Sequence, residues 1–220
     1  MFLALINYTY KKDLEKLMEI YPTITTNVVD TPIIAFDKLD GSNIRAEWSR
    51  KSSFSKFGTR KRLLDANEKP FGEAIGLFMD SYADNLDAIF RKQRYERATA
   101  FVEFAGERSF AGFHEDEPHK VTLFDVHVYK QGMLPAKEFL KVFGNKVETA
   151  EVLFEGKVTQ EFKDSVRNST LEGMTFEGVV CKGGLDNRRR PINFKLKSQV
   201  WFDKLRNKVG DNDALFEKLK

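Results

Sequence analysis

The sequence IIAFDKLDGSNIRAEW, residues 33–48, is the most informative part of the chain. Ile33–Phe36 and Ile44–Trp48 are rich in β-branched and aromatic residues, which predicts two strands. Between them, Lys38 follows the first strand directly and precedes Asp40 and Gly41, a pair typical of turns. A lysine in this position is expected at the mouth of a site. The alternative is a hairpin turn with a solvated lysine, which so short a motif does not exclude.

The remaining strand and helix patterns do not alternate strictly, which favours an α+β fold with mostly antiparallel sheet. The 20 phenylalanines indicate aromatic packing between sheets. Gly72–Lys92 carries apolar residues at helical spacing and predicts the longest helix. Further strands are predicted at Ala100–Phe104, Val121–Tyr129, Gly178–Cys181 and Ile192–Leu196, and further helices at Lys11–Ile20, Pro135–Phe143, Thr159–Arg167 and Asp213–Lys220.

Length and composition set limits on the class of protein. The 220 residues suffice for one domain with its own core, and a single cysteine excludes an internal disulfide. No apolar run is long enough for a signal peptide or a membrane span, so a cytoplasmic protein is expected. The net charge of +3 is mild, but two stretches, residues 50–62 and 187–197, are basic and contain no Asp or Glu. Such clustering predicts a polarised surface, unless the two stretches are merely solvated loops.

The common phosphate-binding loops are absent, since neither Gly-x-x-x-x-Gly-Lys-Ser/Thr nor Gly-x-Gly-x-x-Gly occurs. The chain instead carries a series of short motifs: KLDG at 38–41, FVEFAG at 101–106, LFDV at 123–126, FEGVV at 176–180 and FKLK at 194–197. The series resembles the covalent nucleotidyltransferases, which comprise the ATP-dependent RNA and DNA ligases and the mRNA capping enzymes. It is most similar to polynucleotide ligases of the RNA ligase 2 type, over about Phe36 to Lys197.

The resemblance implies an ATP-grasp-like nucleotidyltransferase core: two antiparallel sheets with flanking helices and ATP between them. Residues 1–220 would form a single adenylation domain, in which 198–220 is a short helical tail and no barrel domain is appended. The implied function is an ATP-dependent polynucleotide ligase, specifically an RNA ligase, which joins 5′-phosphate and 3′-hydroxyl ends through lysyl-AMP and an adenylylated 5′ end. The alternatives are a compact DNA ligase, a GTP-using capping guanylyltransferase, or a non-catalytic nucleic-acid-binding protein on the same scaffold.

Three lysines are the central catalytic candidates. Lys38 would attack the α-phosphate of ATP, which requires its neutral amine, and nearby cations and burial would lower its pKa. Lys195 and Lys197 are two residues apart on a predicted strand, so both point to one face while Phe194 and Leu196 point to the core. These two cations would neutralise the α-phosphate during displacement.

The other candidates are carried over from the resemblance to matching positions. Glu177 would help to bind Mg²⁺ or Mn²⁺, and Glu103 would accept hydrogen bonds from the ribose. Phe124 would stack on adenine, although a core aromatic is nearly as good an interpretation. Arg60 would contact the nucleotide, with Lys61 and Arg62 as rivals for that role. The remaining motif positions are Asp37, Asp40 (where the RNA ligase 2 group usually has histidine), Gly41, Asn43 and Asp125.

The expected partner is nucleic acid, namely RNA ends or nicks, or RNA/DNA hybrids. Basic side chains would hold backbone phosphates beside the site. No membrane contact is expected, and a monomer is the default. The candidate nucleic-acid contacts are Arg50, Lys51, Lys56, Lys61, Arg62, Arg188, Arg189 and Arg190.

Overall fold

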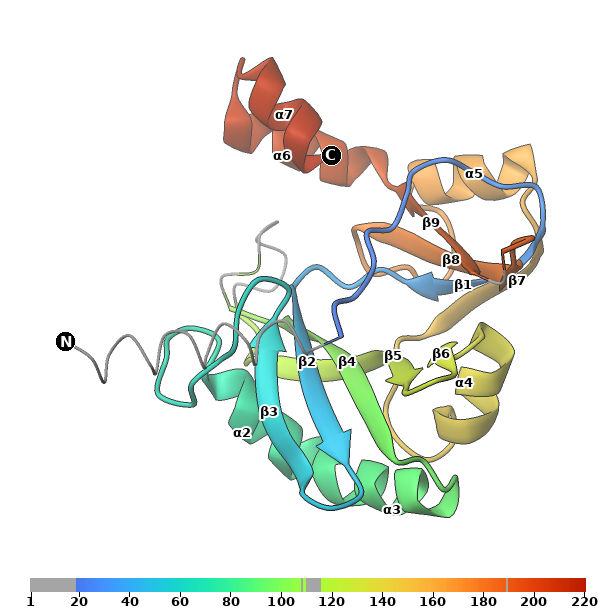
Figure 1. Cartoon of the computed structure of the whole chain (residues 1–220). Helices are drawn as coiled ribbons and strands as arrows, with labels where there is room; N and C mark the ends of the chain where they lie inside the picture. The colour runs from blue at the N-terminus through green and yellow to red at the C-terminus, as the bar shows by residue number, and fades with distance from the viewer. Residues whose placement is uncertain (1–18, 108, 110–115, 189) are drawn as a thin grey trace.

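A computed structural model describes residues 19–107, 109, 116–188 and 190–220. Its strands form two sheets, a four-stranded one in the order β7-β1-β8-β9 and a five-stranded one in the order β3-β2-β4-β5-β6 (Figure 1). Every pair of neighbouring strands is antiparallel, which confirms the predicted α+β class. The strands are β1 Pro32–Asp37, β2 Ser42–Ser49, β3 Ser53–Thr59, β4 Arg97–Ala105, β5 Lys120–Val128, β6 Gly132–Met133, β7 Val152–Lys157, β8 Gly178–Leu185 and β9 Pro191–Lys197.

Strand β1 is buried on both faces, which explains its unbroken apolar sequence. Ile34 and Phe36 face the main core, which lies mainly between the five-stranded sheet and the helices that cover it. Ile33 and Ala35 face a second core that is closed by helix α5 (Gln160–Arg167). The next strand, β2, belongs to the other sheet, so the four residues between them cross from sheet to sheet.

Helices cover the outer face of the five-stranded sheet (Figure 1). The helix predicted over Gly72–Lys92 is present but divided into α2 (Glu73–Phe78), a π-helical turn η1 (Met79–Ala83) and α3 (Asp84–Lys92). In the π turn the Tyr82 hydroxyl is buried, 3.2 Å from the carbonyl oxygen of Val121 and 3.0 Å from that of Glu148. Hydrophobic periodicity alone could not reveal this π-helical turn, because the contacts that favour it come from distant parts of the chain.

Aromatic side chains fill the main core, but they pack between the five-stranded sheet and its helices, whereas the sequence predicts packing between sheets. Phe78 is fully buried, and its ring centroid lies 4.9 Å from that of Phe54, 5.5 Å from that of Phe57 and 5.7 Å from that of Tyr82. Helix α4 (Ala136–Phe143) extends this cluster towards β1, where Phe139 lies 6.3 Å from Phe36. Edge-to-face packing of this kind adds to the stabilisation from burial.

The strands that the sequence analysis missed are β3, β6 and β7. Strands β3 and β7 are edge strands, and β6 has only two residues. Residues in β3 such as Ser53, Ser55 and Lys56 are polar because one side of the edge faces solvent. Most of the helix predicted over Lys11–Ile20 lies outside the described residues.

Two helices, α6 (Gln199–Val209) and α7 (Asp213–Leu219), follow β9 and extend away from the sheets (Figure 1). They form a small core of their own, in which Trp201 and Leu205 pack against Phe176. In the described ranges, no helix is both long and apolar enough to cross a membrane.

Candidate active site

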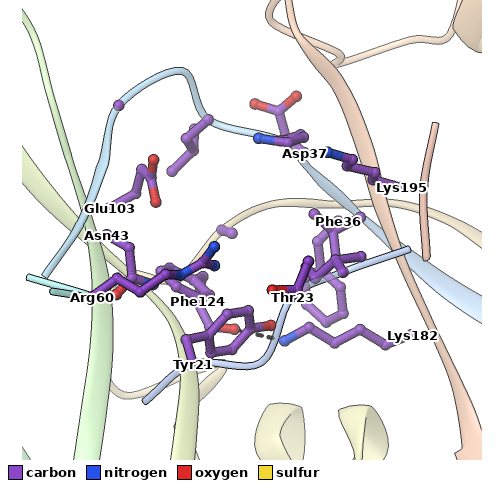
Figure 2. A pocket seen from close by; sticks show the side chains of 16 residues that line it. Tyr21, Thr23, Phe36, Asp37, Asn43, Arg60, Glu103, Phe124, Lys182 and Lys195 are labelled. Carbon is purple, nitrogen blue, oxygen red and sulfur yellow. Dashed lines mark hydrogen bonds between the residues drawn. The ribbon is translucent and has the colours of Figure 1, made fainter. Parts of the chain in front are cut away.

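A cleft of about 290 Å³ lies between the two sheets (Figure 2). On one side, a cross-strand row of Phe36, Val180 and Lys195 runs over β1, β8 and β9. On the other side, Asn43 and Glu103 are paired across β2 and β4. The cleft thus brings together many residues that are far apart in sequence, and the site candidates that line it are Asp37, Lys38, Gly41, Asn43, Arg60, Glu103, Phe124 and Lys195.

Lys38 begins the segment that crosses from one sheet to the other. Its backbone N–H donates to the carbonyl of Gly178 at 3.0 Å, which fixes the segment to β8. At the other end of the segment, a Cβ on Gly41 would overlap the carbonyl oxygen of Phe104. Only glycine allows so close an approach to β4. The Asp-Gly turn is therefore a tight connection at the base of the cleft, and the solvated-hairpin alternative is wrong.

Glu177 holds two of the three candidate lysines. Its Oε2 accepts a hydrogen bond from Lys38 Nζ at 2.7 Å, and its Oε1 lies 3.0 Å from Lys197 Nζ. The carboxylate and Lys197 are both buried, so this cluster lies behind the cleft wall, and neither residue lines the cavity itself. The structure brings Lys38, Glu177 and Lys197 together and places Lys195 beside them on the open face.

The surroundings of Lys38 correct one expectation. Burial would lower the pKa of its ammonium, but the negative charges of Glu177, Glu103 and Asp40 outweigh burial and raise that pKa. The prediction that neighbouring cations depress it was wrong, because the nearest charged group is a carboxylate. Lys38 is therefore a protonated, ion-paired ammonium in this arrangement.

The other two lysines behave as expected for crowded, buried cations. Burial, followed by the charge of Lys38, lowers the pKa of Lys195. Burial also lowers the pKa of Lys197 to about 8, although the charge of Glu177 opposes that shift. Lys195 and Lys197, and not Lys38, are therefore the lysines whose pKa is lowered.

Two polar groups face the cleft from the five-stranded sheet. Burial, with the charges of Glu177 and Asp40, raises the pKa of Glu103 to about 8, although Lys38 opposes the shift. The carboxyl is then largely protonated at neutral pH and can donate as well as accept a hydrogen bond. Asn43 Oδ1 is buried and has no hydrogen-bond partner among the described residues. A buried acceptor without a partner is unfavourable, so this atom marks a place for a ligand donor.

The far end of the cleft is formed by a hydrogen-bonded group. Lys182 Nζ lies 2.9 Å from Asp125 Oδ2 and donates to the carbonyl of Phe124 at 2.7 Å. The Tyr21 hydroxyl donates to the same Asp125 oxygen at 3.1 Å. Phe124 is only partly buried and presents its ring to the cleft, with Tyr21 edge-on at 5.0 Å. An exposed ring face beside fixed polar groups suits a nucleobase.

Lys182 and Tyr21 were missed by the sequence analysis. The signal for Lys182 was available, because it stands two residues after Val180 on β8 and so shares the face that lines the cleft. Tyr21 lies in a segment without regular structure, and no pattern distinguishes it. That segment crosses the cleft: Thr23 and Ile24 line the cavity, and the carbonyl of Thr25 accepts from Lys195 N at 2.9 Å.

Asp37 lines the cleft but is already engaged. Its two carboxylate oxygens accept from the backbone N–H and the hydroxyl of Thr175, at 3.1 and 2.7 Å. Burial raises its pKa in spite of these bonds. Asp37 therefore ties the end of β1 to the segment before Glu177, which is a structural contribution to the site.

The basic stretches do not border the cleft as units. Arg60 enters it from the end of β3, whereas its rival Arg62 pairs with Glu68 outside it. Lys56 lies 3.9 Å from Glu47 in a second hollow of about 480 Å³ on the same sheet face. Of the nucleic-acid candidates, none of those that the structure describes lines the cleft. Arg50 and Lys51 lie in the β2–β3 turn, Lys61 follows β3, Arg188 and Arg190 lie in the β8–β9 turn, and Arg189 is outside the described residues.

The carboxylates that the structure describes around the site are not gathered into a metal-binding cluster. In the described part of the chain, no group of three or more His, Cys, Asp and Glu side chains is arranged to hold a metal ion. This donor set fits Mg²⁺ or Mn²⁺ bound with a phosphorylated substrate, since Mg²⁺ typically uses one or two protein carboxylates and completes its shell with phosphates and water. Glu177 is the buried carboxylate nearest to Lys38.

Comparison with solved structures shows the same fold in an RNA ligase of Naegleria gruberi. A mutant of that ligase with AMP and Mn superposes with a TM-score of 0.63 at 15% identity, covering 85% of this chain and 58% of that one. The same ligase with PPi gives 0.63 at 14% identity, covering 86% and 58%. A mutant with ATP and Mn gives 0.62 at 14% identity, covering 85% and 58%. The chain thus spans less than two thirds of the length of these structures.

Among curated protein sequences, no match is found. The family model described as RNA ligase matches residues 31–197, which include every motif from Lys38 to Lys197. These residues are about three quarters of the 220 in the chain and contain both sheets and most of the residues that line the cleft. The chain belongs to the RNA ligase family.

Proposed function

We propose that this protein is an ATP-dependent RNA ligase, which joins a 5′-phosphate end to a 3′-hydroxyl end. The observation that carries the proposal is the contact of Lys38 with Glu177, and of Glu177 with Lys197, at the base of the cleft between the two sheets. Membership of the RNA ligase family supports it, as does a fold shared with a ligase whose structures hold ATP, AMP, PPi and Mn.

The cleft has the chemistry of a nucleotide site. Phe124 offers a ring face to the base, and the polar groups of Glu103 and Asn43 offer hydrogen bonds to the ribose. Arg60 and Lys195 bring positive charge from opposite sheets for the phosphates. Lys38 is assigned to the phosphate end, because its ammonium contacts Glu177 and its charge acts on Lys195.

The proposed first step is the transfer of AMP to Lys38. The Lys38 ammonium gives up a proton to solvent, its nitrogen forms a bond to the α-phosphorus, and the bond from that phosphorus to the β-phosphate bridging oxygen breaks, which releases pyrophosphate. A divalent cation at Glu177 would supply positive charge that competes with Lys38 for the carboxylate and neutralises phosphate oxygens. Lys195 and Lys197 would stabilise the charge that develops on the α-phosphate.

The later steps follow from the same chemistry. AMP passes from Lys38 to the 5′-phosphate of a polynucleotide, and a 3′-hydroxyl then attacks that phosphate and displaces AMP. We further propose that residues 1–220 act as one adenylation unit in the cytoplasm. RNA would be held through Lys and Arg side chains at the ends of the β2–β3 and β8–β9 hairpins, outside the cleft.

The test is covalent labelling. The protein is incubated with Mg²⁺ and α-labelled ATP or GTP, denatured, and assayed for retained label. We expect label from ATP in the wild type and in Lys137→Ala, a matched change of an exposed lysine outside the cleft, and no label in Lys38→Ala or Lys38→Arg. Lys38→Arg keeps the charge, but guanidinium has no accessible neutral amine at ordinary pH.

Two outcomes would overturn the proposal. If neither nucleotide labels the protein, the protein is a non-catalytic nucleic-acid-binding protein on this scaffold. Label from GTP alone would indicate capping chemistry. A second assay presents nicked duplexes with RNA or DNA at each side of the nick. Sealing of only all-DNA nicks would contradict RNA ligation while preserving adenylylation.

A further inference from the structure

Lys197 has a second close neighbour besides Glu177. Its ammonium nitrogen lies 3.2 Å from the ring centroid of Trp201 and 3.0 Å from Glu177 Oε1. The Lys197 side chain is 5% exposed, and Trp201 is 3% exposed. The ammonium is thus enclosed between a carboxylate and the face of an indole ring.

We propose that Trp201 is a positioning residue, which holds the Lys197 ammonium where it can contact a reacting phosphate. This rests on the proposed function, in which Lys197 stabilises the α-phosphate. An indole face attracts a cation through its quadrupole but supplies no counter-charge. The ring therefore orients Lys197 without neutralising its positive charge, which stays available to a phosphate. A second carboxylate in the place of the ring would cancel that charge.

Trp201 is itself fixed to the strand end that presents Glu177. The connection is Ser198, which is fully buried and begins helix α6. Ser198 Oγ accepts from Trp201 N at 3.1 Å and donates to the carbonyl of Phe176 at 2.8 Å, while Ser198 N donates to the carbonyl of Glu177 at 3.0 Å. The hydrogen bonds of Ser198 therefore connect the backbone next to Lys197 with that of Glu177 and Trp201.

The ring contact comes from outside the part of the chain that the family model matches. That match ends at Lys197, and α6 begins at Gln199. The buried side of α6, formed by Trp201 and Leu205, packs on Phe176 immediately before Glu177. The helix thus completes a cluster whose charged members all lie within the matched residues.

The first experiment compares three variants in a single-turnover adenylylation assay. Trp201→Leu removes the aromatic face, Trp201→Phe keeps a weaker one, and Leu205→Ala disturbs the same small core one turn away at a side chain that has no aromatic face. We expect the maximal rate to fall by about 3- to 30-fold in Trp201→Leu, the range that corresponds to a cation–π contact, with a smaller change in the ATP concentration for half-maximal rate. Trp201→Phe should recover part of the loss.

A purely structural role predicts a different pattern. In that case Leu205→Ala would slow adenylylation as much as Trp201→Leu, which would overturn the proposal.

Because Trp201→Leu could also fail to fold, the wild-type chain is in addition labelled with mono-, di- and trifluorinated tryptophan. Fluorine weakens the ring quadrupole with little change in shape, so we expect a stepwise loss of rate. In Trp201→Phe, where Trp48 is the remaining tryptophan, fluorination should have no effect; an equal loss there would contradict the inference.

A measurement without nucleotide separates this inference from the proposed function. A lysine side chain held over an indole face has its methylene ¹H resonances shifted upfield by the ring current. We expect such a shift for Lys197 that disappears in Trp201→Leu and persists in Leu205→Ala. Absence of the shift in the wild type refutes the contact whatever the activity. Its presence in a protein that forms no adenylate would refute the proposed function and, with it, the catalytic use of the contact.

Discussion

At the scale of single residues, the cleft depends on buried charges that are paired. Lys182 and Asp125 are 4% and 2% exposed and 2.9 Å apart, and the ammonium also lies over the rings of Phe36 and Phe139 at 4.8 and 5.2 Å. A buried pair of this kind adds little net stability, but the loss of one partner leaves the other charge uncompensated. The pair therefore fixes the shape of the cleft beside Phe124.

Removal of Lys182 alone should be strongly destabilising. We expect Lys182→Met to lower the free energy of unfolding by about 3 to 5 kcal/mol, because Asp125 then remains buried without a cation. Adding Asp125→Asn should restore part of that loss, since an amide needs no counter-charge and can still accept from Tyr21. Urea unfolding at neutral pH measures both effects.

The control for this prediction is the exposed ion pair of Lys137 and Glu155. Their separation is 3.1 Å, but their side chains are 82% and 61% exposed. Lys137→Met should therefore change stability by less than about 1 kcal/mol. If the double variant were less stable than Lys182→Met alone, the argument from charge compensation would be wrong.

At the scale of elements, two helices that begin with the same kind of N-cap hydrogen bond lie in different parts of the fold. Thr159 caps α5, where its hydroxyl oxygen accepts from Phe162 N at 3.1 Å, and Ser198 caps α6 in the same way. Helix α5 covers the outer face of the four-stranded sheet, whereas α6 begins beside Glu177. The two caps are therefore a matched pair, one remote from the cleft and one joined to it.

We expect Ser198→Ala and Thr159→Ala each to cost about 1 kcal/mol of stability, the usual effect of losing an N-cap hydroxyl. Ser198→Ala should cost somewhat more, because its hydroxyl also donates to the carbonyl of Phe176. Only Ser198→Ala should slow adenylylation. Thermal unfolding and single-turnover labelling of both variants test this; an equal loss of rate in Thr159→Ala would show that general destabilisation is responsible.

At the scale of the whole molecule, the site exists because two sheets face each other. The segment of residues 38–41 crosses between them at the base of the cleft, and the segment of residues 21–25 crosses the cleft from the five-stranded sheet to β9. The second segment contacts the five-stranded sheet through Tyr21, whose ring lies 5.1 Å from Phe101, and pairs with β9 through Thr25 and Phe194. It also lies outside the residues matched by the family model.

Loosening this second segment should weaken nucleotide binding. We expect glycine at both Thr23 and Ile24 to raise the ATP concentration for half-maximal adenylylation by about 3- to 10-fold, equivalent to ~1 kcal/mol, because the cleft loses wall contacts and the segment gains freedom. The matched control replaces Val28 and Val29 by glycine. These residues are exposed and lie outside the cleft, so the control should bind ATP normally. Weakened binding in both variants would mean that segment flexibility alone, without wall contacts, is responsible.

The sequence by itself determined the antiparallel α+β class, six of the strands and, through the resemblance to the nucleotidyltransferases, half of the residues that line the cleft. These were predictable because strand faces alternate locally and because the motifs keep their order along the chain. The edge strands β3 and β7 could not be predicted in this way, since half-exposed edges carry mixed polar sequences.

Only the tertiary structure decided the electrostatics of the site. Glu177 is 139 residues from Lys38 along the chain, and their 2.7 Å contact reverses the expected direction of the Lys38 pKa. Tyr21, Lys182 and Trp201 likewise join the site through packing between distant segments. Hydrophobic periodicity depends on near neighbours, whereas a pKa or a cation–π contact depends on which charges and rings folding brings within a few ångströms.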